Sequence, residues 1–178
     1  SVEPGCWADW EGEKRDVKLY KYWTPNTRES VADNHAIDFF GGLLEDATKI
    51  RLNSDVPIGI FLSGGIDSGL VASQVKKCGK NNISAHTVRF PDWSNDESLL
   101  SQKTADHLGI ELKIYDADTP SMAKLVNIIS HFDQPFSDPS AIATSLVCEE
   151  ASKNVSVILS GDGGDESFAG YRENPRAL

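Results

Sequence analysis

Residues 63–69, with the sequence SGGIDSG, form the segment of the chain best suited to bind an anion. They follow an apolar run of strand length at residues 57–62 and precede residues 70–75, which have helical character. A glycine-rich turn at such a junction directs backbone N–H groups outward, and the helix dipole adds partial positive charge there. Gly64 and Gly65 carry no Cβ, so the backbone can approach a phosphate closely. The pattern predicts a phosphate-binding loop.

The polar side chains of this loop extend the prediction to a metal ion. Ser63 and Ser68 can donate hydroxyl hydrogen bonds to a phosphate. Asp67 would repel the same phosphate unless a divalent cation joined the two, so we assign Asp67 to Mg²⁺. The sequence contains neither the Walker A pattern G-x-x-x-x-G-K-[ST] nor the G-x-G-x-x-G of dinucleotide-binding folds. A kinase-like transfer of the γ-phosphoryl group is therefore disfavoured.

A second acidic, glycine-rich motif, SGDGGDE at residues 160–166, follows a predicted strand at residues 155–159. Because the carboxyl ends of parallel strands lie at one edge of a sheet, both motifs are expected to face the same ligand. Asp67 and Asp165 could then share Mg²⁺ ions that bridge phosphates and neutralise the charge of a departing pyrophosphate. A solvated turn and a calcium site are the alternatives for this motif, which lacks the spacing of an EF-hand loop.

The elements that must position both motifs alternate between strands and helices. This alternation predicts an α/β fold with a doubly wound parallel sheet and a ligand at the carboxyl ends of its strands. The predicted strands are residues 57–62, 84–90, 110–115 and 155–159, and the predicted helices are residues 70–75, 96–108, 121–132 and 141–153.

The beginning of the chain has a different pattern. Two aromatic, partly alternating runs within residues 4–23 predict a β-hairpin, and a linker is expected at residues 24–32. An amphipathic helix is predicted at residues 33–52. Gly41 and Gly42 inside it each cost about 1 kcal/mol relative to alanine, so we expect close packing against a neighbour at these two positions.

Composition limits the partners of the 178-residue chain. Its formal net charge is −10, from 27 acidic and 17 basic residues, and no basic stripe offers a surface to nucleic acid. No apolar run is long enough to predict a membrane span, no signal peptide is recognised, and the cytoplasm is the expected compartment. Cys6, Cys78 and Cys148 show neither paired nor CxxC spacing, so we expect reduced thiols.

The motifs together carry a family resemblance. SGGIDS is similar to the PP-loop signature of the N-type ATP pyrophosphatases, which include the GMP, NAD, argininosuccinate and asparagine synthetases and cleave ATP between its α- and β-phosphates. SGDGGDESFAGY, with DVPIG before SGGIDS and DQPFSDPS between the motifs, resembles the asparagine synthetase family over nearly the whole chain. The resemblance implies a fold of the adenine nucleotide alpha hydrolase-like type and an ATP-dependent carbon–nitrogen ligase.

The resemblance also implies roles for individual residues. Asp162 stands where some family members carry a glutamate near the activated substrate, so it would orient the acceptor or move a proton, and Glu166 is the other catalytic candidate. Glu97 and Asp138 could be site residues but equally fit helix caps or loop charges, and the sequence leaves their roles open. The implied nucleotide ligands are the backbones of Leu62 and Val88 for adenine, Ser160 and Gly161 beside the nucleotide, Ser63, Gly64, Gly65 and Ser68 for pyrophosphate, and Asp67 and Asp165 for magnesium.

The implied reaction of the full-length enzyme converts aspartate and MgATP to β-aspartyl-AMP and pyrophosphate, after which ammonia from glutamine displaces AMP. A sister enzyme with another carboxylate or amine, such as a β-lactam synthetase or a peptide- or sugar-linked amidotransferase, would share the nucleotide motifs. A fragment that binds ATP without turning it over is a further interpretation. The implied partners are ATP, aspartate or another carboxylate and an upstream glutaminase domain, and a homodimer of the full-length enzyme is compatible with them.

Two departures from the family pattern lead us to expect a fragment. Family members with glutaminase activity begin with a free cysteine, whereas this chain begins with Ser1, and the internal Cys6 is expected to be structural. Family synthetase domains also continue to a later catalytic lysine, while this chain stops at Leu178. We expect residues 1–32 to be the last hairpin of a glutaminase domain with its linker, and residues 33–178 to be a truncated synthetase domain.

Overall fold

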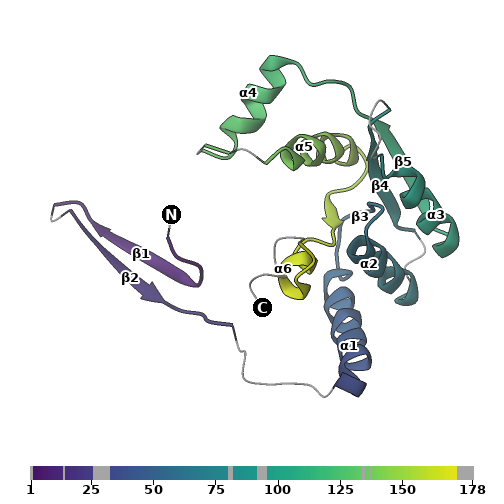
Figure 1. Cartoon of the computed structure of the whole chain (residues 1–178), viewed down its shortest axis with the longest axis horizontal. Helices are drawn as coiled ribbons and strands as arrows, with labels where there is room; N and C mark the ends of the chain where they lie inside the picture. Colours follow the sequence, from purple (N-terminus) through teal and green to yellow (C-terminus); the bar gives the residue numbers. More distant parts are fainter. Residues whose placement is uncertain are drawn as a thin grey trace. The chain divides into compact units, whose positions relative to one another are not determined.

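Two compact units, Ser1–Phe40 and Gly41–Leu178, make up the computed structural model of the chain (Figure 1). None of the helices in the described part of the chain combines the length and apolar character needed to cross a membrane. The three cysteines are free thiols, as expected. The predicted linker at residues 24–32 lies almost entirely outside the described residues. The structure describes residues 2–13, 15–25, 33–79, 82–91, 96–133, 135–136 and 138–171.

The predicted β-hairpin is present in the first unit. Strand β1 spans Cys6–Glu11 and pairs in antiparallel register with β2, which spans Asp16–Lys21. Trp7 and Tyr20 lie directly opposite each other, and their stacked rings have centroids 4.3 Å apart. Cross-strand aromatic pairs of this kind stabilise a hairpin by roughly 0.2–1 kcal/mol.

Four parallel strands form the sheet of the second unit, in the order β5-β4-β3-β6. β6 joins the sheet beside β3, on the side away from β4, so the strand order reverses between β3 and β6. Doubly wound sheets bind ligands beyond the carboxyl ends of the strands at such a switch point. The predicted fold class is confirmed. The strands are β3 Ile58–Phe61, β4 Ser84–Arg89, β5 Glu111–Asp116 and β6 Val157–Leu159.

Helices pack against this sheet (Figure 1). α2 contacts β3, α3 contacts β4 and β5, and α5 contacts β4. The predicted helices are confirmed, with ends that shift by a few residues, and the short α6 inside the second motif was not predicted. The helices are α1 Asp33–Arg51, α2 Ile66–Lys77, α3 Ser98–Leu108, α4 Met122–Ser130, α5 Ser140–Ala151 and α6 Gly164–Phe168.

The core of the second unit lies between the sheet and the pair α2 and α3. Ile60 of β3 and Ala85 of β4 are completely buried and share one apolar cluster with Ala72 of α2 and Ala105 of α3. The small alanines let the helices approach the sheet closely. His86 follows Ala85 in β4, so its side chain points to the opposite face of the sheet. The buried core thus fixes the strand ends from which both motifs leave.

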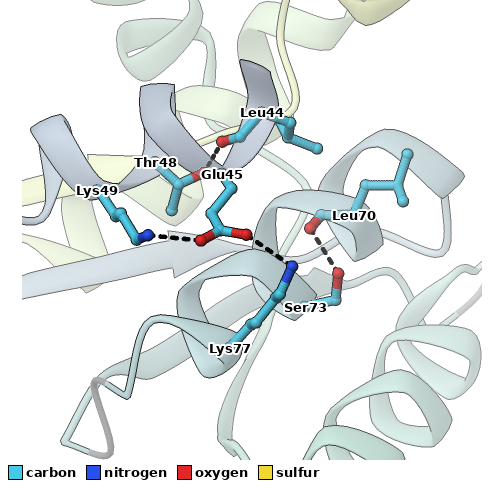
Figure 2. A network of polar contacts seen from close by, with 7 residues as sticks. All are labelled: Leu44, Glu45, Thr48, Lys49, Leu70, Ser73 and Lys77. Carbon is cyan, nitrogen blue, oxygen red and sulfur yellow. Dashed lines mark hydrogen bonds and ion pairs between the residues drawn. The ribbon is translucent and has the colours of Figure 1, made fainter. Parts of the chain in front are cut away.

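An ion-pair network joins α1 to α2 within the second unit (Figure 2). The Glu45 carboxylate accepts hydrogen bonds from Lys49 at 2.5 Å and from Lys77 of α2 at 2.6 Å. These two ammonium groups, with the Lys49 hydrogen bond as the largest cause, lower the pKa of Glu45 to about 2. Glu45 is therefore ionised at neutral pH and holds two helices together.

The expectation of close packing at Gly41 and Gly42 is wrong. A Cβ built on either glycine would meet no atom within 4 Å in the described structure. The helix forms there in spite of the glycines because its later turns make tertiary contacts, through the Glu45 network and through Leu52, which is buried just beyond the helix end.

Candidate functional site

The first glycine loop connects the end of β3 to α2. Leu62 donates its backbone N–H to the His86 carbonyl at 3.0 Å, which extends the ladder between β3 and β4 past the last strand residue. Helix α2 begins at Ile66, earlier than predicted, so Asp67 and Ser68 lie in its first turn. The first turn of a helix favours negative charge because the backbone N–H groups there are unpaired.

Two serine hydroxyls hold this loop together. The Oγ atoms of Ser63 and Ser68 lie 2.9 Å apart, and the Ser63 N–H donates to the Ser68 Oγ at 3.1 Å. Ser63 Oγ also accepts the Gly65 N–H at 3.1 Å. The hydroxyls predicted to bind phosphate therefore also shape the loop, and a phosphate would share them with these internal hydrogen bonds.

The second glycine loop leaves β6 and turns sharply into α6. Ser160 Oγ donates to Asp162 Oδ2 at 2.9 Å. Gly163 has a φ of +92°, a left-handed conformation that favours glycine, and the Gly164 N–H donates to the Gly161 carbonyl at 3.2 Å. This turn brings Gly164, the first residue of α6, against Asp67 of the first loop.

The two loops touch each other through glycines. A Cβ built on Gly161 would lie 2.7 Å from the Ser68 backbone nitrogen. A Cβ built on Gly164 would lie 2.5 Å from Cγ of Asp67, closer than real Cβ atoms come. The Asp67 carboxylate therefore lies against the second motif, one residue from Asp165. The two predicted magnesium ligands, Asp67 and Asp165, both line the open space between the two loops.

An open cavity of about 760 Å³, here called the acidic cavity, lies between the two loops. Five carboxylates line it, and none of its lining residues in the described structure is lysine, arginine or histidine. Most of the residues predicted for the site line this cavity. Its lining also includes Phe61, Ile66, Phe168 and Tyr171, which were not predicted as site residues. The predicted lining residues are Ser63, Gly65, Asp67, Ser68, Ser160, Gly161, Asp162, Asp165 and Glu166, and Glu97 supplies the fifth carboxylate.

Tyr171 returns to the acidic cavity after α6 ends. Ala169 has a left-handed φ of 55°, and the turn it makes carries the Tyr171 hydroxyl to Glu166, to which it donates at 2.7 Å. This hydrogen bond lowers the pKa of Glu166 and raises the pKa of Tyr171 to about 12. At neutral pH the phenol is protonated and the carboxylate is ionised. Tyr171 is the last residue of the segment SGDGGDESFAGY, but the sequence did not predict its partner.

A second cavity of about 970 Å³, here called the apolar cavity, lies beside the first. Leu62 and Val88, the two predicted adenine contacts, line it together with apolar side chains of α5 such as Val147. The Leu62 N–H is used in the sheet, so the carbonyl of that residue is the backbone group left for a ligand. The two cavities share the lining residues Phe61, Ser63 and Glu97. They therefore adjoin.

Gly64 is the one predicted site residue that lines neither cavity. Its N–H donates to Glu97 Oε2 at 3.2 Å. Glu97 was expected to be a helix cap or a loop charge, and although it occupies the N-cap position of α3, its side chain makes no capping hydrogen bond. Asp138 does act at a helix start: its Oδ1 accepts the Ser140 N–H at 2.9 Å, which lowers the pKa of Asp138.

The acidic cavity fits a magnesium ion that arrives with a phosphate ligand. No group of three histidine, cysteine or acidic side chains forms a metal cluster in the part of the chain that the structure describes. Mg²⁺ at nucleotide sites usually takes one or two carboxylates and completes its shell with waters and phosphate oxygens. Asp67 and Asp165 offer such a pair.

Comparison with known proteins identifies relatives of this chain. The family model described as asparagine synthase matches residues 40–178. Asparagine synthetase [glutamine-hydrolyzing] 1 of Bacillus subtilis is 41% identical over 159 residues, which are 88% of this chain and 25% of that protein. Putative asparagine synthetase [glutamine-hydrolyzing] 2 of Methanocaldococcus jannaschii is 35% identical over 162 residues, 89% of this chain and 31% of that protein. The chain thus spans about a quarter to a third of these curated relatives.

Solved structures support the fold. The glutamine-dependent NAD+ synthetase of Acinetobacter baumannii, solved in complex with adenosine diphosphate, matches with a TM-score of 0.56. The match covers 92% of this chain and 31% of that chain at 21% sequence identity. At this identity the similarity concerns the arrangement of strands and helices.

Proposed function

The chain belongs to the asparagine synthase family, and we propose that its second unit is the ATP-binding part of an enzyme that activates aspartate as β-aspartyl-AMP. In the full-length protein, ammonia released from glutamine would then displace AMP to give asparagine. The observation that carries this proposal is a pair of adjoining cavities: an acidic one between the loops that follow β3 and β6, at the switch point of the sheet, and an apolar one beside it.

The two cavities match the two ends of ATP. Adenine would lie in the apolar cavity, against the backbones of Leu62 and Val88. The phosphates would pass Ser63, which lines both cavities, and reach Gly65 and Ser68 in the first loop. Outward-facing N–H groups at the start of α2 favour the negative charge of pyrophosphate there.

Asp67 and Asp165 would hold Mg²⁺ on the phosphates. The bound metal would neutralise the charge that pyrophosphate gains as it leaves. The protein needs such help because the described lining of the acidic cavity carries no basic side chain. The nucleotide would therefore bind as its magnesium complex.

Positioning is the main catalytic device in this proposal. A carboxylate oxygen of aspartate would form a bond to the α-phosphorus as the bond from that phosphorus to pyrophosphate breaks. Holding both reactants in this geometry can supply about 7–11 kcal/mol in favourable cases. Asp162, fixed by the Ser160 hydroxyl at 2.9 Å, would accept a proton when ammonia attacks the activated carbonyl. Glu166, held by Tyr171, would keep the second loop in place.

Isotope exchange tests the adenylation step. Full-length protein is incubated with ATP, Mg²⁺, labelled pyrophosphate and one carboxylic acid at a time, and the label entering ATP is measured. We expect exchange with aspartate and none without an acid. Exchange with a different acid alone would assign the chain to a sister enzyme, and ATP binding without exchange for any acid would reduce it to a binding module.

A further inference from the structure

The side chain of Glu97 makes a contact that the proposed reaction does not use. Its Oε2 accepts the Gly64 N–H at 3.2 Å across 33 residues of sequence. The two residues also pack together, because a Cβ built on Gly64 would lie 3.2 Å from Cβ of Glu97. The carboxylate thus contacts the phosphate loop and does not cap its own helix.

The backbone of Glu97 is fixed while its side chain is exposed. Its carbonyl accepts the N–H groups of Leu100 and Ser101 at 3.0 Å each, and the Ser101 hydroxyl at 3.1 Å. Ser101 is completely buried, so this end of α3 is firmly anchored. The exposed carboxylate can therefore rotate away from Gly64 without a movement of the helix.

The contact places an anion where pyrophosphate is proposed to bind. The Gly64 N–H is one of the expected pyrophosphate donors, yet Gly64 lines neither cavity. Glu97 lines both cavities, at their shared boundary. A carboxylate and a phosphate oxygen accept the same backbone N–H in the same way, and their like charges repel. The Glu97 carboxylate and a phosphate therefore cannot occupy this position at the same time.

We propose that Glu97 determines the anion specificity of this loop by acting as an internal competitor of pyrophosphate. A ligand must displace the carboxylate from Gly64, which a metal-bound polyphosphate can do through several contacts and a single phosphate cannot. Return of the carboxylate then promotes release of pyrophosphate. This inference rests on the proposed function, since it requires that the loop binds the pyrophosphate group of ATP.

The test removes the charge and measures pyrophosphate affinity directly. Glu97→Gln and Glu97→Ala are prepared in the full-length protein, and the binding of magnesium pyrophosphate and of inorganic phosphate is followed by titration calorimetry. We expect both variants to bind pyrophosphate about tenfold more tightly, because a charge-assisted but exposed hydrogen bond no longer competes. Inorganic phosphate should bind measurably only to the variants.

Asp106→Asn is the matched control. It removes one negative charge from the same helix, and Asp106 accepts a hydrogen bond from Gln102 at 2.8 Å and lines neither cavity. Its pyrophosphate affinity should equal that of the wild type. Unchanged or weaker pyrophosphate binding in both Glu97 variants would overturn the inference, because Glu97 would then be a support of the loop. The binding measurement needs no turnover, so a wild type that binds pyrophosphate without aspartate-dependent exchange would contradict the proposed function alone.

Discussion

Carboxylates in the second unit occupy two opposite environments. Glu45 on α1 is neutralised by Lys49 and Lys77, as Figure 2 shows. The acidic cavity gathers five carboxylates, and its described lining includes no basic side chain. The first arrangement is balanced within the protein, whereas like charges in the second repel one another. In the proposed function, the charge of the cavity is balanced by a cation that arrives with the ligand.

Two carboxylates of the acidic cavity accept hydrogen bonds from neutral hydroxyl groups, whereas Glu45 accepts them from lysines. Ser160 donates to Asp162, and Tyr171 donates to Glu166. A hydroxyl that donates a hydrogen bond fixes the position of a carboxylate, but it does not cancel the charge. The surface network therefore serves stability, whereas the carboxylates of the cavity have no basic partner among its described lining residues.

The largest effect is expected from Asp67→Asn. If the cavity charge binds Mg²⁺, this change should lower magnesium-dependent adenylation on the order of 1000-fold, as loss of a group that stabilises transition-state charge does elsewhere. The measurement is AMP formation by the full-length protein, with circular dichroism to show that the fold is retained. Asp46→Asn, at an exposed position of α1, is the control of equal charge and should be fully active. If Asp67→Asn formed AMP at the wild-type rate, the assignment of Asp67 as a magnesium ligand would be wrong.

Gly164→Ala tests whether the two loops must touch. The new Cβ would lie 2.5 Å from Cγ of Asp67, so the carboxylate or α6 has to move. A misplacement of this size can cost up to about 100-fold in adenylation rate. The matched control is Gly42→Ala, whose Cβ would meet no described atom within 4 Å and which should stabilise α1 by about 1 kcal/mol. Equal activity of both variants would contradict the contact between the loops.

Much of the fold could be predicted because its apolar residues repeat with the periods of strands and helices. Ile60 and Ala85 are buried where the pattern places them. The short α6 lies inside a glycine motif and has no period to detect. The early start of α2 depends on hydrogen bonds between Ser63 and Ser68, which no local pattern records.

The sequence predicted which residues belong to the site, but not which of them contact one another. The two motifs supplied most of the residues that line the acidic cavity, whereas Ser63 is their one residue in the lining of the apolar cavity. The contact of Gly64 with Glu97 joins residues far apart in sequence, and only the packing of α3 against the first loop creates it. The hydrogen bond from Tyr171 to Glu166 likewise depends on a left-handed turn at Ala169. Alanine seldom adopts this conformation, so the sequence does not predict the turn.

The smallest effect is expected from Glu45→Gln, which breaks the balanced arrangement and leaves the cavity intact. The folded pKa of Glu45 is about 2, below its ordinary value of 4.5, so its ion pairs stabilise the fold above pH 4.5 and lose this contribution as the pH falls toward 2. Urea unfolding should give the variant a lower midpoint at pH 7, and the difference from wild type should vanish near pH 2. Glu149→Gln, which loses a single pair to Lys124, should shift the midpoint less. Adenylation should be unchanged in both variants, and a loss of activity in Glu45→Gln would show that the surface network and the cavity are coupled.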